Sequence, residues 1–559
     1  MYADVAVPSY KGPNADSFTY EIPKDLEVKP GQLVMVPFGR KQEIGLVLST
    51  DSNLPTTDYK LKSVDSLIFE KPFLLPYQLQ LIDWMASYYL ATKNNVAAAV
   101  LPELPERRQE VSGIKYQVSR THQTLVLVPT INNIPQTMAL FPKAASAVVY
   151  HSDLKPKEKL DAWQKTLSGQ ADYVFGTRQT IFFPAPNLKK IIILNEHDDS
   201  YKDQRAPYYD TLTVAQKLLE LTQSKLEIID SSPKITTYFN HKEVTKIAKP
   251  KQEVKTKIVS MLNEKLGGNK TPVSYDLEVT TSDTLKAGGK VLLFLNKKKE
   301  SGTLYCNNCK YQESLEKEPD KCPNCGSPEI FFASLNVGSL AKQIAKLFPK
   351  VGINILAEKK GHLPFVGNQL SIDIATSAVF YQLLPKHYDL VAAISTDSTL
   401  NIPEFSAPEK AYTQITNLKR LSKKYFILQT YQVDNFTIQC AVEGNYQAFF
   451  EAQIKERQAL SYPPYSQLVK LVLESKEEPI EKLTYELKST IPQPISILGP
   501  FVPIYKKAKP TQHLIIKAPT KTGSLSEKEK VLDVINIALK AANAAKTAKQ
   551  IIVDPLTLN

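Results

Sequence analysis

Four of the five cysteines stand in a pattern that can hold a metal ion. They form two C-x2-C pairs separated by twelve residues: Cys306, Cys309, Cys322 and Cys325. Two such pairs can present four thiolates tetrahedrally to zinc at about 2.3 Å. Because every ligand position is a cysteine, no position stays open for water or substrate, and we expect one structural zinc ion. The alternatives are a redox-active C-x-x-C pair or unrelated free thiols.

Glycine, which phosphate-binding loops require, is scarce in this chain. There are 20 glycines in 559 residues, about half the usual ~7%. Loops that cradle phosphates use glycine so that backbone N–H groups can approach the ligand closely. The pattern G-x-x-x-x-G-K-[ST], which would bind ATP phosphates and Mg²⁺, does not occur in the sequence. The chain therefore has few places for a nucleotide loop.

The overall composition is that of a multidomain globular protein with a basic balance. Lys and Arg number 69 against 57 Asp and Glu, a formal net charge of +12. At roughly 100–200 residues per domain, this length suggests about three to five domains. The basic balance weakly favours a polyanionic partner. No apolar run approaches the ~18 residues of a membrane span, and Tyr2–Val5 does not resemble a secretory signal, so we expect a cytoplasmic protein without a membrane partner.

The elements that must position these residues alternate in type along the chain. Residues 1–70 indicate a small β-rich module, and apolar residues at helical spacing over 75–92 predict a helix packed on it. Residues 105–122 are polar and read as a linker. Strand and helix patterns then alternate twice, which predicts two α/β lobes with parallel sheets. Short apolar runs mark the expected strands at 124–128, 147–150, 173–175, 191–194, 291–295, 352–357, 371–374, 390–394 and 425–429.

Several blocks of sequence, in order along almost the whole chain, resemble the PriA family of bacterial replication-restart helicases. Quoted as they stand, the blocks include Ser17–Pro23, Val34–Arg40, Leu125–Pro129, Gly176–Arg178, Glu196–Lys202, Pro403–Phe405, Ser461–Tyr465 and Leu498–Pro500. The resemblance implies an α/β multidomain fold. It would consist of a β-rich 3′-DNA-binding domain (1–104), degenerate RecA-like helicase lobes (123–260 and 261–460), a zinc module (301–332) inserted in the second lobe, and an α+β C-terminal domain (461–559).

The chain departs from the resembled family at the motor motifs. The phosphate loop should precede the strand at Leu125–Val128, but only the linker 105–122 stands there, so loop and winged-helix domain are reduced or missing. Where the family has Asp-Glu-Glu-His, this chain has Leu194, Asn195, Glu196 and His197, and the family's arginine motif after Gln414 is out of register. Without the lysine and Mg²⁺, most electrostatic stabilisation of phosphoryl transfer is lost. We therefore expect a pseudo-helicase and assign no catalytic residue.

The zinc region retains four of the family's eight cysteines.

The resemblance also implies DNA contacts. In the N-terminal domain Phe18, Thr19, Gly39 and Lys62 would line a pocket for the 3′ end of a nascent strand, with Phe18 stacking and Lys62 on phosphate. Thr19 stands where the family commonly has Asp. The alternatives are a core-facing Phe18 and a solvated Lys62.

Other basic residues fall in family blocks or in a basic run near the C-terminus. Arg178 and Lys202 would touch DNA or hold loops in place. Lys506, Lys507 and Lys509 would bind branched DNA or the acidic tail of single-stranded DNA-binding protein, or form a solvated face.

Together these features favour a replication-restart protein. It would recognise forked or branched DNA with a 3′ end and recruit the replicative helicase or its loader, in the cytoplasm at the nucleoid, without ATP-driven unwinding. One alternative is a weak or partner-assisted ATP-dependent 3′–5′ helicase. Another is a zinc-stabilised protein-interaction scaffold without a role on DNA.

Overall fold

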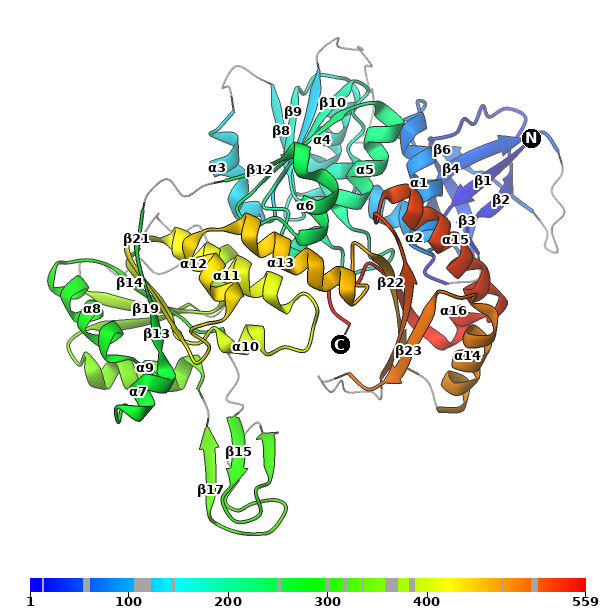
Figure 1. Cartoon of the computed structure of the whole chain (residues 1–559). Helices are drawn as coiled ribbons and strands as arrows, with labels where there is room; N and C mark the ends of the chain where they lie inside the picture. The colour runs from blue at the N-terminus through cyan, green and yellow to red at the C-terminus, as the bar shows by residue number, and fades with distance from the viewer. Residues whose placement is uncertain are drawn as a thin grey trace. The chain divides into compact units, whose positions relative to one another are not determined.

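The computed structural model divides the chain into two compact units (Figure 1). The first unit combines Met1–Ile247 with Ile454–Asn559, and the second unit is Ala248–Gln453. The structure describes residues 1–12, 15–53, 61–104, 122–141, 146–248, 253–296, 302–315, 319–333, 335–356, 370–381, 388–474, 477–503 and 511–558.

The N-terminal domain is a six-stranded sheet with two helices beside it. The strand order is β5-β2-β1-β4-β3-β6, and all pairings are antiparallel except β2 with β5. The bounds are β1 (Tyr2–Ala6), β2 (Phe18–Glu21), β3 (Leu33–Phe38), β4 (Lys41–Asp51), β5 (Lys62–Ser63), β6 (Ser66–Leu67), α1 (Pro76–Tyr88) and α2 (Lys93–Val100). The β-rich module and the following helix agree with the sequence prediction.

The first lobe, residues 123–247, is a parallel six-stranded sheet ordered β12-β11-β10-β7-β9-β8. Its strands are β7 (Gln123–Leu127), β8 (Ala147–Tyr150), β9 (Tyr173–Gly176), β10 (Leu188–Leu194), β11 (Lys225–Asp230) and β12 (Thr245–Ile247), and its α-helices are α3 (Ile134–Met138), α4 (Pro156–Leu167), α5 (Thr211–Thr222) and α6 (Ile235–His241). Along β10, Ile191 and Ile193 enter one apolar cluster and Ile192 enters another. The sheet is thus buried on both faces, as parallel sheets require.

The C-terminal domain belongs to the same compact unit as the N-terminal domain and the first lobe. Its antiparallel sheet is ordered β23-β24-β22-β25. The elements are β22 (Ser466–Leu473), β23 (Ser496–Phe501), β24 (Gln512–Pro519), β25 (Ala548–Val553), α14 (Glu477–Thr490), α15 (Leu525–Ala541) and α16 (Ala544–Thr547). Trp84 of α1 donates from Nε1 to Glu529 of α15 at 2.6 Å, so the two ends of the chain are tied by a direct hydrogen bond.

The second unit is another parallel six-stranded sheet, ordered β13-β21-β20-β14-β19-β18. Its strands are β13 (Lys255–Ser260), β14 (Val291–Phe294), β18 (Gly352–Leu356), β19 (Ser371–Ala375), β20 (Tyr388–Ala393) and β21 (Ser422–Thr430). Its α-helices are α7 (Met261–Leu266), α8 (Tyr275–Lys286), α9 (Val337–Leu347), α10 (Asp397–Leu400), α11 (Ala407–Leu421), α12 (Phe436–Glu443) and α13 (Tyr446–Ala459), the last of which continues past Gln453 into the first unit.

A small antiparallel sheet, β16-β15-β17, interrupts this second unit between β14 and β18. It comprises β15 (Gly302–Cys306), β16 (Gln312–Leu315) and β17 (Ile330–Ala333), and it carries the cysteine pairs.

The expected boundary between the two lobes at residue 260 is corrected by the pairing of β13. This strand runs parallel to β21, with Lys255 opposite Tyr425 and Ser260 opposite Thr430, and therefore belongs to the second sheet. Over Lys255–Ile258 its side chains alternate between exposed and partly buried positions, because it forms the edge of that sheet, and Val259 is buried. Because this sequence is rich in lysine, a search for apolar runs does not detect the edge strand.

Among the described helices, none combines the length and the hydropathy that crossing a bilayer demands.

We predict that Trp163 on α4 is a major source of stability in the first unit. Its ring stacks on Phe73 of the N-terminal domain with centroids 5.1 Å apart, and its Nε1 donates to the Phe73 carbonyl at 3.2 Å. The side chain is fully buried, so Trp163→Ala should cost about 3–5 kcal/mol, measured as a lower midpoint of urea denaturation. Asp161→Ala, at an exposed position of the same helix, should shift stability by less than about 0.5 kcal/mol. Equal midpoints for the two variants would contradict this role.

Candidate DNA-binding surface and zinc site

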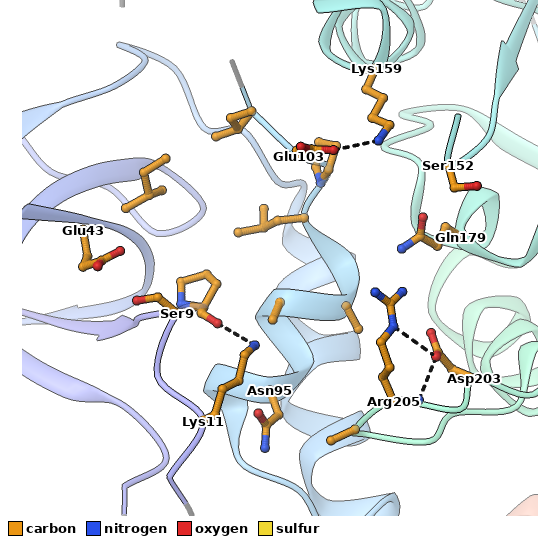
Figure 2. A pocket seen from close by; sticks show the side chains of 18 of the residues that line it. Ser9, Lys11, Glu43, Asn95, Glu103, Ser152, Lys159, Gln179, Asp203 and Arg205 are labelled. Atoms are coloured by element: carbon orange, nitrogen blue, oxygen red, sulfur yellow. Dashed lines mark hydrogen bonds and ion pairs between the residues drawn. The ribbon is translucent and has the colours of Figure 1, made fainter. Parts of the chain in front are cut away.

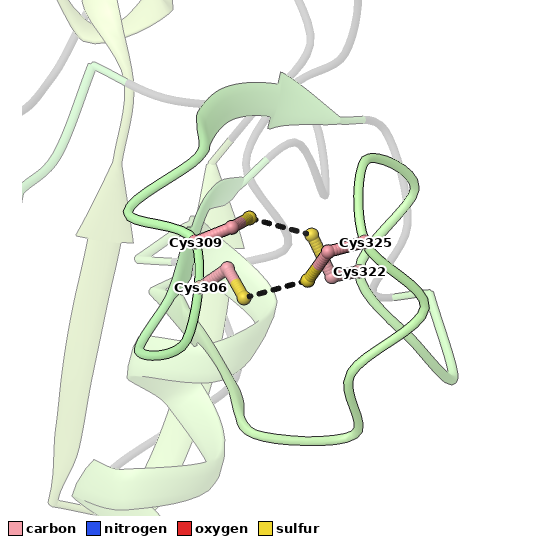
Figure 3. A group of neighbouring side chains, drawn as sticks. All are labelled: Cys306, Cys309, Cys322 and Cys325. Atoms are coloured by element: carbon pink, nitrogen blue, oxygen red, sulfur yellow. Dashed lines mark hydrogen bonds between the residues drawn. The ribbon is translucent and has the colours of Figure 1, made fainter.

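The four cysteines converge in the small inserted sheet and the turns beside it (Figure 3). Their sulfur atoms all lie within 4.8 Å of one another. The Sγ atoms of Cys306 and Cys325 are 3.7 Å apart, and those of Cys309 and Cys322 are 3.6 Å apart. Sulfur atoms ligated tetrahedrally at about 2.3 Å would lie at comparable separations, so the cluster fits a zinc ion.

Amide groups close to the cysteines support binding of thiolates. Asn324 donates to Cys309 Sγ at 3.5 Å, and Asn308 approaches Cys325 Sγ at 3.9 Å. Donors of this kind stabilise a thiolate and orient it toward a metal. The sequence pattern therefore led to a real spatial cluster.

In the N-terminal domain, three of the four predicted pocket residues lie in one neighbourhood. The rings of Phe18 and Phe38 meet edge to face at 4.9 Å, and Tyr10 contacts both. Lys62 donates from Nζ to the Gly39 carbonyl at 3.4 Å, next to Phe38 in the chain. An exposed lysine therefore lies beside an aromatic cluster, an arrangement suited to a nucleotide with its phosphate. We call Tyr10, Phe18, Phe38, Gly39 and Lys62 the aromatic cluster.

Two details refine the prediction for this pocket. Gly39 has a positive φ of 59°, and a Cβ there would meet nothing within 4 Å, so the turn conformation requires the glycine and leaves space above it. Thr19 follows Phe18 on β2 and pairs in register with Asp4. Because successive side chains of a strand point to opposite faces, Thr19 faces away from the side that Phe18 occupies. The structure therefore brings Phe18, Gly39 and Lys62 together but not Thr19.

The prediction of a DNA contact by Lys202 is wrong, because this side chain is buried. Lys202 is 3% exposed, and its ammonium donates to the Val553 carbonyl of β25 at 2.5 Å. Lys202 thus ties the first lobe to the C-terminal domain.

Arg178 holds the loop that contains Lys202. Its guanidinium reaches the Asp203 carboxylate and the Ser200 carbonyl, both at 3.3 Å. This contact matches the loop-holding alternative from the sequence. Lys506, Lys507 and Lys509 lie outside the described residues.

The degenerate acidic motif lies at the carboxyl end of β10, where it forms two buried ion pairs with the end of β11. Glu196 is 2% exposed and lies 3.1 Å from the Lys234 ammonium. The His197 Nδ1 lies 2.6 Å from the Asp230 carboxylate. We call Glu196, His197, Asp230 and Lys234 the buried ion cluster.

The charges of this cluster are set by burial and by mutual attraction. Burial raises the pKa of Glu196, and the Lys234 ammonium opposes this rise. The pKa of Lys234 itself is held well above its usual range because Glu196 and Asp210 outweigh the effect of burial. The pKa of Asp230 is lowered, against burial, by His197. Lys234, His197 and Asp230 therefore favour their charged forms, whereas burial works against the charge of Glu196.

Sequence reasoning missed Asp230 and Lys234 because it did not predict β11. The sequence does contain a pattern that predicts this strand, because the turn Ser231–Pro233 follows an apolar segment. Carboxyl ends of parallel strands meet at one edge of a sheet, so this turn had to lie beside Glu196.

No glycine-rich loop lies in the described part of the first lobe. Its two glycines are Gly169 after α4 and Gly176 at the end of β9. A Cβ at Gly176 would come within 2.1 Å of the Tyr150 carbonyl oxygen. This glycine therefore serves close backbone packing between β8 and β9.

We predict that Lys202 makes stability depend on alkaline pH. Burial lowers its pKa to about 8, whereas the unfolded chain keeps this proton up to about 10.4. Between these values the unfolded state binds more protons, so the contribution of Lys202 to folding stability rises with pH. The Lys202→Met variant lacks this contribution. The melting temperature of the wild type minus that of the variant should therefore increase between about pH 8 and about pH 10, and a constant difference would contradict the assignment.

Comparisons with known proteins identify both ends of the chain. The family model of the PriA 3′DNA-binding domain matches residues 4–102, and that of the primosomal protein N C-terminal domain matches residues 458–556. A likeness to the solved structure of S. cerevisiae Dbp5 bound to RNA and ADP BeF3 covers 69% of this chain and 98% of that one, with a TM-score of 0.33 and 11% identity.

Curated relatives extend the similarity across the middle of the chain. "Replication restart protein PriA" of Bacillus subtilis is 27% identical over 443 residues, covering 70% of this chain and 55% of that protein. The protein of the same name from Rickettsia prowazekii is 24% identical over 585 residues, covering 86% and 89%. This chain thus spans little more than half of the Bacillus relative. Both terminal segments thus match models of PriA domains, and the chain is similar to PriA proteins along most of its length.

Proposed function

We propose that this protein recognises forked or branched DNA with a nascent 3′ end and recruits replication proteins there without ATP-driven unwinding. The observation that carries the proposal is a contrast within the first unit. Both terminal domains match models of PriA domains, whereas the acidic motif between them is occupied by the Glu196–Lys234 ion pair.

The Glu196–Lys234 ion pair argues against ATP hydrolysis, because hydrolysis needs a positive charge and a metal ion at the phosphates. A helicase motor stabilises the transferred phosphoryl group with a phosphate-loop lysine and Mg²⁺. Here Leu194 stands where the family has the metal-binding Asp, and it offers no ligand oxygen. Glu196 is paired with Lys234, which caps the amino end of α6. Neither side chain is therefore available to hold a metal or to orient water.

Recognition of DNA does not need these groups. The aromatic cluster offers stacking rings, an open glycine turn and the Lys62 ammonium. Such a combination suits the terminal nucleotide of a strand, with the rings on the base and the lysine on phosphate. Single-stranded DNA-binding protein and the replicative helicase or its loader remain the proposed protein partners. The four-cysteine cluster would hold one structural zinc ion.

We predict fork binding without hydrolysis. Purified, zinc-loaded protein should bind a fork that carries a leading-strand 3′ end, and its ATP hydrolysis should stay at background with or without that fork. Fork affinity should fall steeply with salt, because phosphate contacts release counterions. The measurements are fluorescence anisotropy and phosphate release in parallel. DNA-stimulated hydrolysis by the purified protein would favour the partner-assisted helicase, and absence of any preference for a free 3′ end would favour the scaffold.

A pair of lysine variants makes the fork test specific. Lys62→Ala should reduce the preference for a fork with a free 3′ end over a fork without one by about fivefold or more, because Lys62 contacts phosphate only when the end occupies the aromatic cluster. Lys24→Ala removes an exposed lysine near the opposite end of β2 and should leave that preference unchanged. The proposal for the 3′ end fails when both variants behave alike.

We predict that zinc binds stoichiometrically and depends on the clustered cysteines. The wild type should carry about one zinc ion per chain by mass spectrometry of metals, because the four thiolates fill a tetrahedral shell. Cys322→Ser should lose most of the zinc. Cys440→Ser, which alters a buried cysteine outside the cluster, should retain it. Zinc loss from both variants or from neither would contradict the assignment.

A further inference from the structure

A cavity of about 780 Å³ opens within the first unit, between the N-terminal domain, α2 and the first lobe (Figure 2). This volume lies in the range of small-molecule sites. Part of its wall comes from the segment Pro8–Lys11 and from α2, and part from the carboxyl ends of β8 and β9. The carboxyl edge of a parallel sheet is where ligands bind in α/β folds.

Polar groups without mutual partners face this cavity. Tyr150 is 4% exposed, and its hydroxyl has no hydrogen bond to any described residue, although it lines the cavity. The side-chain amides of Asn95 and Gln179 also line the cavity and likewise make no hydrogen bond within the described chain. The Tyr150 hydroxyl is therefore free to form a hydrogen bond with a group that enters this space.

The free charge of the cavity is positive. Arg205 is exposed, and its nearest carboxylate, Asp203, is 3.7 Å away. The Lys11 ammonium donates to the Pro8 carbonyl at 2.8 Å and keeps further protons for a ligand. The pKa of Lys11 is lowered, first by partial burial and then by repulsion from Arg205, and both cations line the same cavity.

The acidic groups of the cavity do not cancel this charge. Glu103 is paired with Lys159 at 2.8 Å, and Asp203 is paired with Arg178 at 3.3 Å. Glu43 is the remaining carboxylate among the described lining residues. Asp203 is shared between Arg178 and Arg205, so the four cations Lys11, Lys159, Arg178 and Arg205 exceed the three carboxylates Glu43, Glu103 and Asp203 by one.

The cavity and the aromatic cluster share one backbone segment, Ser9–Lys11. Tyr10 contacts Phe18 and Phe38, while Ser9 and Lys11 on either side of it line the cavity. A strand whose last nucleotide occupied the aromatic cluster would therefore have its preceding nucleotides beside the cavity.

We propose that this cavity binds the phosphodiester backbone of the DNA strand immediately upstream of its captured 3′ end. Arg205 and Lys11 bind phosphate, and Gln179, Asn95 and the Tyr150 hydroxyl bind phosphate or sugar oxygens. This inference rests on the proposed capture of a 3′ end.

The test compares a dinucleotide and a decanucleotide, both ending in a free 3′-hydroxyl, by fluorescence anisotropy over a salt series. Arg205→Ala should weaken decanucleotide binding by about five- to tenfold and reduce the salt slope by about 0.7, the value for one phosphate contact on a single strand. Its effect on the dinucleotide should be small. Lys11→Ala should act in the same direction. Lys225→Ala, an exposed lysine at the amino end of β11 and so at the opposite edge of the same sheet, should change neither affinity nor slope.

The outcomes separate this inference from the proposed function. Should Lys62→Ala weaken both ligands while Arg205→Ala behaves like Lys225→Ala, the cavity assignment is overturned and 3′-end capture stands. Should Arg205→Ala weaken the decanucleotide in a wild type that shows no preference for a 3′-hydroxyl, the cavity binds DNA but 3′-end capture fails. Free thymidine monophosphate that binds wild type but not Arg205→Ala, with unchanged decanucleotide affinity, would assign the cavity to a mononucleotide and overturn the proposal.

Discussion

The ion pair between Glu196 and Lys234 is the constraint on which the first lobe depends. Both side chains lie at the carboxyl edge of a parallel sheet, away from bulk water, where an unpaired charge is costly. Removing one partner of such a pair typically costs about 3–5 kcal/mol because the other charge stays buried. In a motor protein, this edge of the sheet would contact a ligand. Here its charged side chains pair with one another, and the adjacent His197–Asp230 pair does the same.

Hydrogen bonds join the N-terminal domain, the first lobe and the C-terminal domain of the first unit. Lys202, which follows Glu196 and His197 in the chain, donates to Val553 of the C-terminal domain. Tyr88 of the N-terminal domain donates to Asp554 at 3.3 Å. Trp84 bonds Glu529. Each of these bonds is partly or fully buried, so each depends on the exact fit of elements that are far apart in sequence.

Much of the fold was predictable from local pattern, and the exceptions have physical causes. The strands of the first lobe with apolar runs, such as Ile191–Leu194, were recognised because burial on both faces leaves a continuous signal. The edge strand β13 was not, since one exposed face makes its sequence look polar. The cysteine cluster was predictable because metal coordination demands a fixed spacing. The burial of Lys202 was not, because its partner is a backbone carbonyl 351 residues away and leaves no mark in the sequence.

The division of the chain into two units has a consequence for how the protein is made. The second unit, Ala248–Gln453, is an insertion within the first, and during synthesis it can fold as soon as it has emerged, in the way that domains generally do. The first unit must wait. Its N-terminal domain and first lobe are made early, but the acceptors for Trp84, Tyr88 and Lys202 are supplied only by residues 529–554. Until those residues leave the ribosome, Trp84, Tyr88 and the Lys202 ammonium lack their acceptors, so the last thirty or so residues of the chain complete a core that the first hundred began.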